Sequence, residues 1–271
     1  MSVAGPSAGA RFTPSHRGGE GPPLLLLHGF TDTWRTWEPV LPALERRFEV
    51  LAPTLVGHAG GRDFPADGAS DTAIVDAVEA LLDEADWEAP AIAGNSLGGF
   101  VALRLAERGR ARSVVALAPA GGWAEDDPAI AETLRYFRVM AKMVRDAAPR
   151  AEEIASTPEG RAAASVAYAS NADHLSADLL AHLIRGAAAC DSEPLVAFAE
   201  REGWRLDPER VTCPVRFVWG TDDKLLVLPG AAARFRSEFP QAEWIEFEGG
   251  GHCPQLDHPV ETAELIAGFS G

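Results

Sequence analysis

A serine between glycines is the residue of this chain best suited to nucleophilic chemistry. Ser96 lies in Gly-Asn-Ser-Leu-Gly-Gly, residues 94–99, directly after an apolar run and directly before a helical pattern. This is the G-x-S-x-G pattern of a nucleophile on a sharp strand-to-helix turn. Glycine at positions 94 and 98 removes side chains that would clash there, and the positive end of the following helix favours developing negative charge. The pattern predicts Ser96 as the nucleophile.

A serine hydroxyl needs a neighbouring base, which is usually a histidine held by a carboxylate. His252 lies in Gly-Gly-Gly-His-Cys-Pro, residues 249–254, directly after the last predicted strand. Such a loop can carry an imidazole over the carboxyl ends of the strands, where ligands bind in open α/β sheets. We therefore expect His252 to be the base. His258 is expected to face solvent or cap a helix, and His174 and His182 are expected at the surface of a helical region.

The carboxylate that orients the base is expected at the end of the preceding strand. The sequence Trp-Gly-Thr-Asp-Asp, residues 219–223, offers both Asp222 and Asp223. The order serine, aspartate, histidine along the chain is one of the known orders of a catalytic triad. Both aspartates are candidates, although Asp222 could instead shape the turn through bonds to its own backbone.

Two backbone N–H groups are predicted to form an oxyanion hole. His28-Gly29-Phe30 directly follows an apolar run, and Gly29 permits a close backbone approach. The N–H of Phe30 would then join that of Leu97 in stabilising a tetrahedral oxyanion, where the loss of one donor typically costs about 10²- to 10³-fold in rate. The ring of His28 is expected to brace neighbouring loops.

Short apolar runs that alternate with helical patterns must position these residues. The predicted strands are 24–27, 48–53, 89–94, 113–118, 215–219 and 244–247, and the predicted helices are 34–46, 71–85, 97–108, 229–238 and 257–269. This alternation predicts a mostly parallel sheet, and the absence of clean polar alternation predicts helices on both of its faces. In the helix at 71–85, a stripe of Ile74, Val78, Leu81 and Leu82 would pack on the sheet, with Ser70 or Asp71 as its cap.

A long segment with helical patterns alone interrupts the alternation of strands and helices. Between residues 122 and 208 the strand-like runs disappear, and the helical patterns are predicted to break at Pro158, Gly160, Asn171, Gly186 and Pro194. We expect an inserted cap over 122–208, a core formed by 24–121 and 209–271, and a flexible lead with a possible first strand over 1–23. The residues that could form an apolar substrate wall are Trp123, Tyr136, Phe137, Met140, Met143 and Trp204.

The composition excludes several classes of partner. The formal net charge of −16 would repel nucleic acid and an anionic membrane surface. The chain has 3 cysteines, with no CxxC spacing, and the N-terminal segment has no apolar stretch typical of a signal peptide. We therefore expect a cytoplasmic protein without disulfides, which acts on a small molecule as a monomer or homodimer.

Together the segments 28–30, 94–99, 219–223 and 251–252 resemble the α/β-hydrolase superfamily, specifically its capped, single-domain branch of esterases and related enzymes. The resemblance spans residues 24–120 and 211–270. It implies an α/β-hydrolase fold, with a mostly parallel central sheet flanked by helices and an inserted helical cap. In this family the acid commonly lies three positions after the glycine of the W-G turn, which favours Asp223. One departure is Thr-Leu-Val-Gly-His-Ala at 54–59, where the family often has Asp-x-Pro-Gly-x-Gly.

The resemblance also narrows the expected reaction. Haloalkane dehalogenases and related epoxide hydrolases have aspartate at the elbow, so Ser96 disfavours both activities. We expect a carboxylesterase-like serine hydrolase that acts on a small to medium apolar ester, with no metal or organic cofactor. The alternatives are C–C bond, thioester or lactone hydrolysis by the same triad. Cofactor-free peroxidase or lyase chemistry and non-catalytic binding of a small molecule are less favoured.

Overall fold

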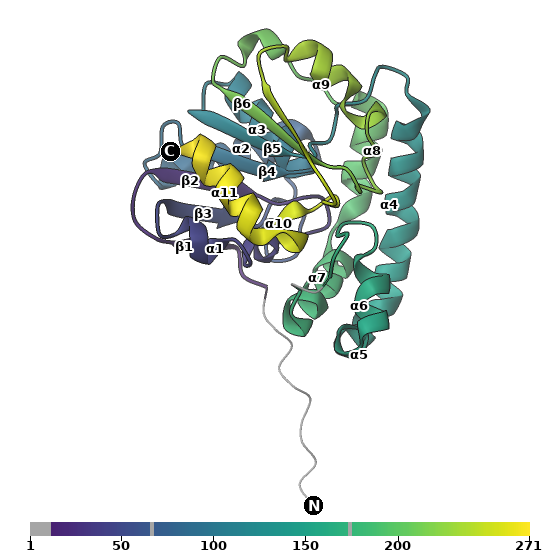
Figure 1. Cartoon of the computed structure of the whole chain (residues 1–271). Coiled ribbons are helices and arrows are strands. Elements are labelled where there is room, and N and C mark those ends of the chain that lie inside the picture. The colour runs from purple at the N-terminus through teal and green to yellow at the C-terminus, as the bar shows by residue number, and fades with distance from the viewer. Residues whose placement is uncertain (1–11, 66–67, 173–174) are drawn as a thin grey trace, which may run out of the picture.

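One sheet of seven strands runs through the part of the chain that the structure, a computed structural model, describes (Figure 1). The described residues are 12–65, 68–172 and 175–271. The strands are β1 (Ser15–Gly18), β2 (Pro23–Leu27), β3 (Glu49–Pro53), β4 (Ala91–Asn95), β5 (Ser113–Leu117), β6 (Val215–Gly220) and β7 (Glu243–Phe247). Their order is β1-β3-β2-β4-β5-β6-β7. Only β1 pairs antiparallel, with β3, so the predicted mostly parallel sheet is confirmed.

Helices and short 3₁₀ turns connect and cover these strands. The helices are α1 (Leu41–Leu44), α2 (Asp71–Glu84), α3 (Leu97–Glu107), α4 (Pro128–Ala147), α5 (Ala151–Ser156), α6 (Pro158–Ser165), α7 (Ala177–Ala189), α8 (Ser192–Glu202), α9 (Ala233–Glu238), α10 (Pro254–Asp257) and α11 (Pro259–Ser270). The 3₁₀ turns are η1 (Trp34–Trp37), η2 (Ala148–Arg150), η3 (Pro208–Arg210) and η4 (Gly230–Ala232). In the described residues, no helix combines the length and apolarity needed to cross a bilayer.

The four consecutive leucines of β2 show why the central strands lack polar alternation. Leu25 and Leu27 belong to an apolar cluster on the face covered by α2 and α3, whereas Leu24 and Leu26 belong to a second cluster under α1 and α11. Successive side chains of a strand point to opposite faces, so a sheet with helices on both sides buries all of them. This arrangement holds the carboxyl ends of the strands in fixed positions.

Local chemistry sets where the flanking helices begin and end. The Ser70 side chain accepts the N–H of Ala73 at 2.9 Å and so caps α2, whose Ile74 and Val78 are buried as the stripe predicts. The single helix predicted over 34–46 is wrong. The chain forms η1 and α1 there instead, because Pro39 and Pro42 lack the N–H groups that a continuous helix requires.

Helices α4 to α8 lie together on one side of the molecule, between β5 and β6 in the chain (Figure 1). Pro158 and Pro194 lie in the first turns of α6 and α8, where proline is tolerated. The predicted break at Gly186 is wrong because α7 continues through it. A side chain there would meet the neighbouring core, since a Cβ would lie 3.1 Å from Cγ2 of Thr33.

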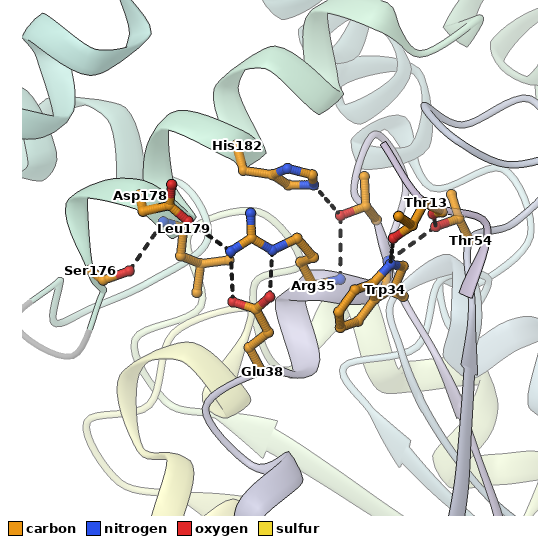
Figure 2. Close-up of polar contacts among 10 residues, drawn as sticks. Thr13, Trp34, Arg35, Glu38, Thr54, Ser176, Asp178, Leu179 and His182 are labelled. Carbon is orange, nitrogen blue, oxygen red and sulfur yellow. Dashed lines mark hydrogen bonds and ion pairs between the residues drawn. The ribbon is translucent and has the colours of Figure 1, made fainter. Parts of the chain in front are cut away.

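A polar network joins α7 to the turn that follows β2 (Figure 2). Arg35 of η1 donates to Asp178 of α7 at 2.8 Å and also pairs with Glu38. Nε2 of His182 lies 3.0 Å from the Thr33 hydroxyl in a hydrogen bond. The expected surface position of His182 is wrong because its ring is buried in this contact, and burial lowers its pKa to about 4. The network therefore ties α7 to η1 and to Thr33, which precedes η1.

Candidate active site

Ser96 occupies a strained turn between β4 and α3. Its φ of 53° lies in a region that residues other than glycine rarely adopt. Three backbone hydrogen bonds hold it there: its N–H donates to Leu117 at 2.9 Å, and its carbonyl accepts from Phe100 and Ala120, both at 3.1 Å. Such strain persists where the surrounding structure enforces it, which is common at functional sites.

The glycines around Ser96 are required by close backbone approaches. A Cβ on Gly94 would lie 2.2 Å from the carbonyl oxygen of Gly98, and a Cβ on Gly98 would lie 2.2 Å from that of Leu27. Real Cβ atoms do not come this close to backbone oxygens, so larger residues would force the turn apart. These are clashes of the kind that the sequence pattern predicts.

His252 and Asp223 form a buried hydrogen-bonded pair. Nδ1 of His252 donates to Oδ2 of Asp223 at 2.8 Å, while Oδ1 accepts the N–H groups of Leu225 and Leu226, both at 2.8 Å. Asp222 is exposed, and its N–H donates to the carbonyl of Gly250 at 2.9 Å. Because Nδ1 carries the shared proton, Nε2 is left as the atom that can accept one.

Ser96 and His252 line the same hollow. Within the described residues, no hydrogen bond joins the Ser96 hydroxyl to the imidazole. Contacts of this kind are often long in free enzymes and tighten when substrate binds. The strained serine and the oriented imidazole therefore share one space, in which a reacting carbonyl group could be placed between them.

Sequence reasoning missed Asn95, which ties the serine turn to the histidine loop. Asn95 is fully buried, and its Nδ2 donates to the carbonyl of His252 at 2.9 Å and to that of Leu117 at 3.1 Å. Its Oδ1 accepts from the thiol of Cys253 at 3.1 Å and from Nε2 of Gln255 at 3.2 Å. The only signal in the sequence is a polar residue at the end of an otherwise apolar run.

Replacing Asn95 with leucine should lower kcat about 10- to 100-fold with little change in KM, because the His252 carbonyl loses its donor and an ångström-scale shift of the base is costly. Steady-state kinetics with p-nitrophenyl butyrate would measure this, and thermal melting would report any loss of stability. The control is Thr221→Val, which removes a hydroxyl that accepts the N–H of Gly249 at 3.0 Å on the exposed side of the histidine loop. An unchanged kcat in the leucine variant would mean that Asn95 does not position the His252 imidazole for the reaction.

The two N–H groups predicted as an oxyanion hole lie beside Ser96. In the described residues neither the N–H of Phe30 nor that of Leu97 donates to another group. A Cβ on Gly29 would lie 3.4 Å from Cβ of Ser96, so the turn after β2 lies directly against the serine. The expected bracing by His28 is confirmed: its Nδ1 donates to the carbonyl of Gly29 at 2.8 Å, and its Nε2 accepts the N–H of Leu55 at 2.9 Å.

Two hollows among the described residues meet at Ser96. Phe30 and Phe137 line both, and their rings are in edge contact with centroids 4.8 Å apart. The predicted wall residues are divided between them. Tyr136 and Met140 line the hollow that contains His252, and Trp123 and Trp204 line the other. Met143 was expected in this wall but is 56% exposed, because it faces outward from α4.

The remaining histidines and the cysteines are not part of the candidate active site described above, apart from Cys253, which lines its hollow. The ring of His258 is half-buried, 4.9 Å from that of Phe247, and its Nε2 is 3.3 Å from the carbonyl of Gly249. His174 lies outside the described residues. The cysteines are free, and no cluster of three or more metal-ligating side chains occurs in the described parts of the chain.

Asp32 is a second residue that sequence reasoning missed. It lines the hollow that contains His252, and Oδ1 accepts the N–H of Thr33 at 2.7 Å. Burial raises the pKa of Asp32 to about 7, although hydrogen bonds from Thr33 and Thr36 partly oppose the shift. Among the ion pairs of the described residues, none includes Asp32. The hollow therefore contains a carboxyl group that lacks a partner of opposite charge.

Replacing Asp32 with asparagine should raise the melting temperature more at pH 8 than at pH 4. The pKa of about 7 in the folded protein exceeds the value of about 3.9 in an unfolded chain. Between these two values the folded state keeps a proton that the unfolded state has lost, so the stability of the parent falls as the pH rises. Asparagine does not titrate and avoids this loss. Melting curves of the parent and the variant at both pH values measure this effect. An equal difference in melting temperature at pH 4 and pH 8 would contradict the raised pKa of Asp32.

Comparison with known proteins links this chain to a family. The model of the "Alpha/beta hydrolase family" matches residues 24–265. Epoxide hydrolase EphH of Mycobacterium tuberculosis is 32% identical over 203 residues, which cover 74% of this chain and 94% of that protein. A pimeloyl-[acyl-carrier protein] methyl ester esterase of Aromatoleum aromaticum is 32% identical over 273 residues, covering 90% and 96%. The structure of a meta-cleavage product hydrolase from Pseudomonas fluorescens superposes with a TM-score of 0.69 at 21% identity, covering 94% and 92%.

Proposed function

Because this chain belongs to the alpha/beta hydrolase family, we propose that it is a serine hydrolase that cleaves a small to medium apolar carboxylic ester through an acyl-enzyme. One observation carries this proposal. The imidazole of His252, held by Asp223 at 2.8 Å, lines the same hollow as the strained Ser96. A hydroxyl, a base and an oriented carboxylate are the parts that acyl transfer by serine requires.

The proposed reaction has two steps. Ser96 attacks the ester carbonyl while Nε2 of His252 takes its proton, and the oxyanion accepts hydrogen bonds from the N–H groups of Phe30 and Leu97. His252 then returns the proton to the departing alkoxide, which leaves as an alcohol. Water attacks the acyl-serine with His252 as its base and releases the acid. These groups carry out the reaction without a cofactor.

The serine also argues against epoxide opening, despite the name of one relative. An aspartate that opens an epoxide forms an ester, and water can attack the carbonyl carbon of that ester. A serine that opened an epoxide would form an ether, which has no carbonyl for water to attack, so the enzyme would be blocked. The residue at position 96 therefore favours a substrate that itself supplies the carbonyl.

The proposal is tested by turnover of p-nitrophenyl acetate, butyrate and octanoate. We expect hydrolysis that requires Ser96, with butyrate favoured over acetate because the hollows beside Ser96 are mainly apolar. A C–C hydrolase would instead cleave these esters slowly and a vinylogous diketone quickly. A protein that only binds its ligand would show no turnover that depends on Ser96. Styrene oxide tests for epoxide hydrolysis, and formation of the diol from it would contradict the proposal.

A further inference from the structure

The position of the base assigns the two hollows to different halves of an ester. His252 lines one hollow, which also contains Asp32, and Leu97 lines the other. The departing oxygen must lie near the imidazole, because His252 gives it a proton. This inference rests on the proposed function: the alcohol half then occupies the hollow with His252, and the acyl half occupies the hollow with Leu97. We refer to them as the alcohol hollow and the acyl hollow.

The acyl hollow suits an uncharged, apolar group. Its walls include Ile74, Trp123, Leu134, Val196 and Trp204, and none of its lining residues carries a charge. An ionised acyl group would lose its hydration there without gaining a partner. The acyl half is therefore expected to be a short hydrocarbon chain or a small ring.

The alcohol hollow differs because, within the described parts of the chain, one acidic side chain lies among its aromatic and aliphatic lining residues. Asp32 lines it, together with the phenols of Tyr136 and Tyr168. Among the residues that the structure describes, no lysine or arginine lines this hollow. Asp32 lies near Tyr168 and Cys253, since its negative charge contributes to raising the pKa of both groups after the larger effect of burial. A carboxyl group in such surroundings gains most from a cation that enters with the ligand.

The aromatic side chains that line the alcohol hollow together with Asp32 favour an organic cation over a small hydrated ion. Phe137 lies next to both Phe30 and Tyr136, with ring centroids 4.8 and 5.7 Å apart. Faces of aromatic rings attract ammonium groups, and this attraction is strongest where water is excluded. The net charge of −16 would also concentrate cations near the protein.

We propose that the alcohol hollow binds an alkylammonium group, so that the preferred substrates are esters of an amino alcohol with a short apolar acid. The Asp32 carboxylate would form an ion pair with the ammonium group. The rings of Tyr136 and Phe137 would contact the alkyl groups of the ammonium. The reaction remains the acyl transfer described above: Ser96 Oγ bonds to the acyl carbon, the bond to the alcohol oxygen breaks, and the amino alcohol leaves with the proton from His252.

A matched pair of substrates tests the charge alone. Butyrylcholine and 3,3-dimethylbutyl butyrate have the same shape, but only the first carries a positive charge. We expect kcat/KM to favour butyrylcholine by about 10-fold or more, the size expected for one partly buried charge contact. The Asp32→Asn variant should bring the ratio of the two kcat/KM values close to one. The control Asp222→Asn removes an exposed carboxylate and should keep the parent ratio.

A binding measurement separates this inference from the proposed function. Titration of the Ser96→Ala variant with choline should show saturable heat, and the double variant with Asp32→Asn should show none. Hydrolysis of p-nitrophenyl butyrate without choline binding, and without preference for butyrylcholine, would overturn the cation site while leaving the serine hydrolase intact. Choline binding that depends on Asp32 in a protein without esterase activity would keep the cation site and remove the proposed function. A preference for a neutral hydroxylated ester, such as glycerol monobutyrate, would also overturn the cation site.

Discussion

Replacing Ser96 with alanine should lower kcat toward p-nitrophenyl butyrate by about 10⁴-fold or more, as removal of a serine nucleophile does in triad enzymes. The Ser96 hydroxyl makes no hydrogen bond within the described residues, so its loss should leave the melting temperature nearly unchanged. Initial rates and melting curves of the two proteins measure both effects. Equal rates in parent and variant would refute the assignment of Ser96 as the nucleophile.

Replacing Asp223 with asparagine should lower kcat by about 10⁴-fold, whereas Asp222→Asn should change it less than about twofold. The two substitutions are chemically identical and lie at adjacent positions, which makes them matched controls. Asp223 accepts the Nδ1 proton of His252 and two backbone N–H groups, while Asp222 is exposed. An asparagine at 223 can present its amide N–H to Nδ1, which moves the ring proton to Nε2 and blocks the base.

A loss of kcat of similar size in both variants would show that the conformation of the turn is required, and not the Asp223 carboxylate that bonds to His252. A larger loss for Asp222→Asn would reverse the assignment of the acid. Circular dichroism and melting curves for each variant separate these outcomes from unfolding. Because the Asp223 carboxylate also binds two backbone N–H groups, a moderate loss of stability is expected at that position alone.

The sequence predicts best the features that depend on neighbouring residues in the chain. The turn at Ser96 needs a strand, two glycines and a helix in succession, so one short segment specifies it. The six runs predicted as strands correspond to β2 through β7. The central strands are buried and require continuous apolar residues, whereas β7 lies at the edge of the sheet and is partly exposed. The bracing role of His28 was also predicted from local sequence, because this residue lies between a strand and a glycine turn.

Several contacts between distant segments were not predicted. Asn95 contacts residues 252 to 255, more than 150 positions away, and no local pattern marks such a partner. His182 is buried because Thr33 and Phe12 lie against it, and those contacts arise only when α7 packs on the core. Asp32 resembles an ordinary turn residue until the fold places it in the wall of a hollow.

The choice between the two aspartates shows the same limit. Composition and spacing allow either residue to orient a base, and the family resemblance favours Asp223. The structure has Asp223 on the imidazole because the turn after β6 directs its side chain inward and leaves Asp222 in solvent. Gly220 lies close against the histidine loop at the start of this turn, since a Cβ there would be 2.0 Å from the carbonyl oxygen of Gly250.

Isolation of the covalent intermediate tests the central claim most directly. The protein would be mixed with p-nitrophenyl butyrate, quenched with acid within the first turnover, and digested for peptide mass spectrometry. A butyryl group on Ser96 in the parent, and none at the same time in His252→Ala, is the predicted result. Turnover without any adduct on Ser96, or with the butyryl group on another residue such as Cys253, would contradict a serine nucleophile activated by that histidine.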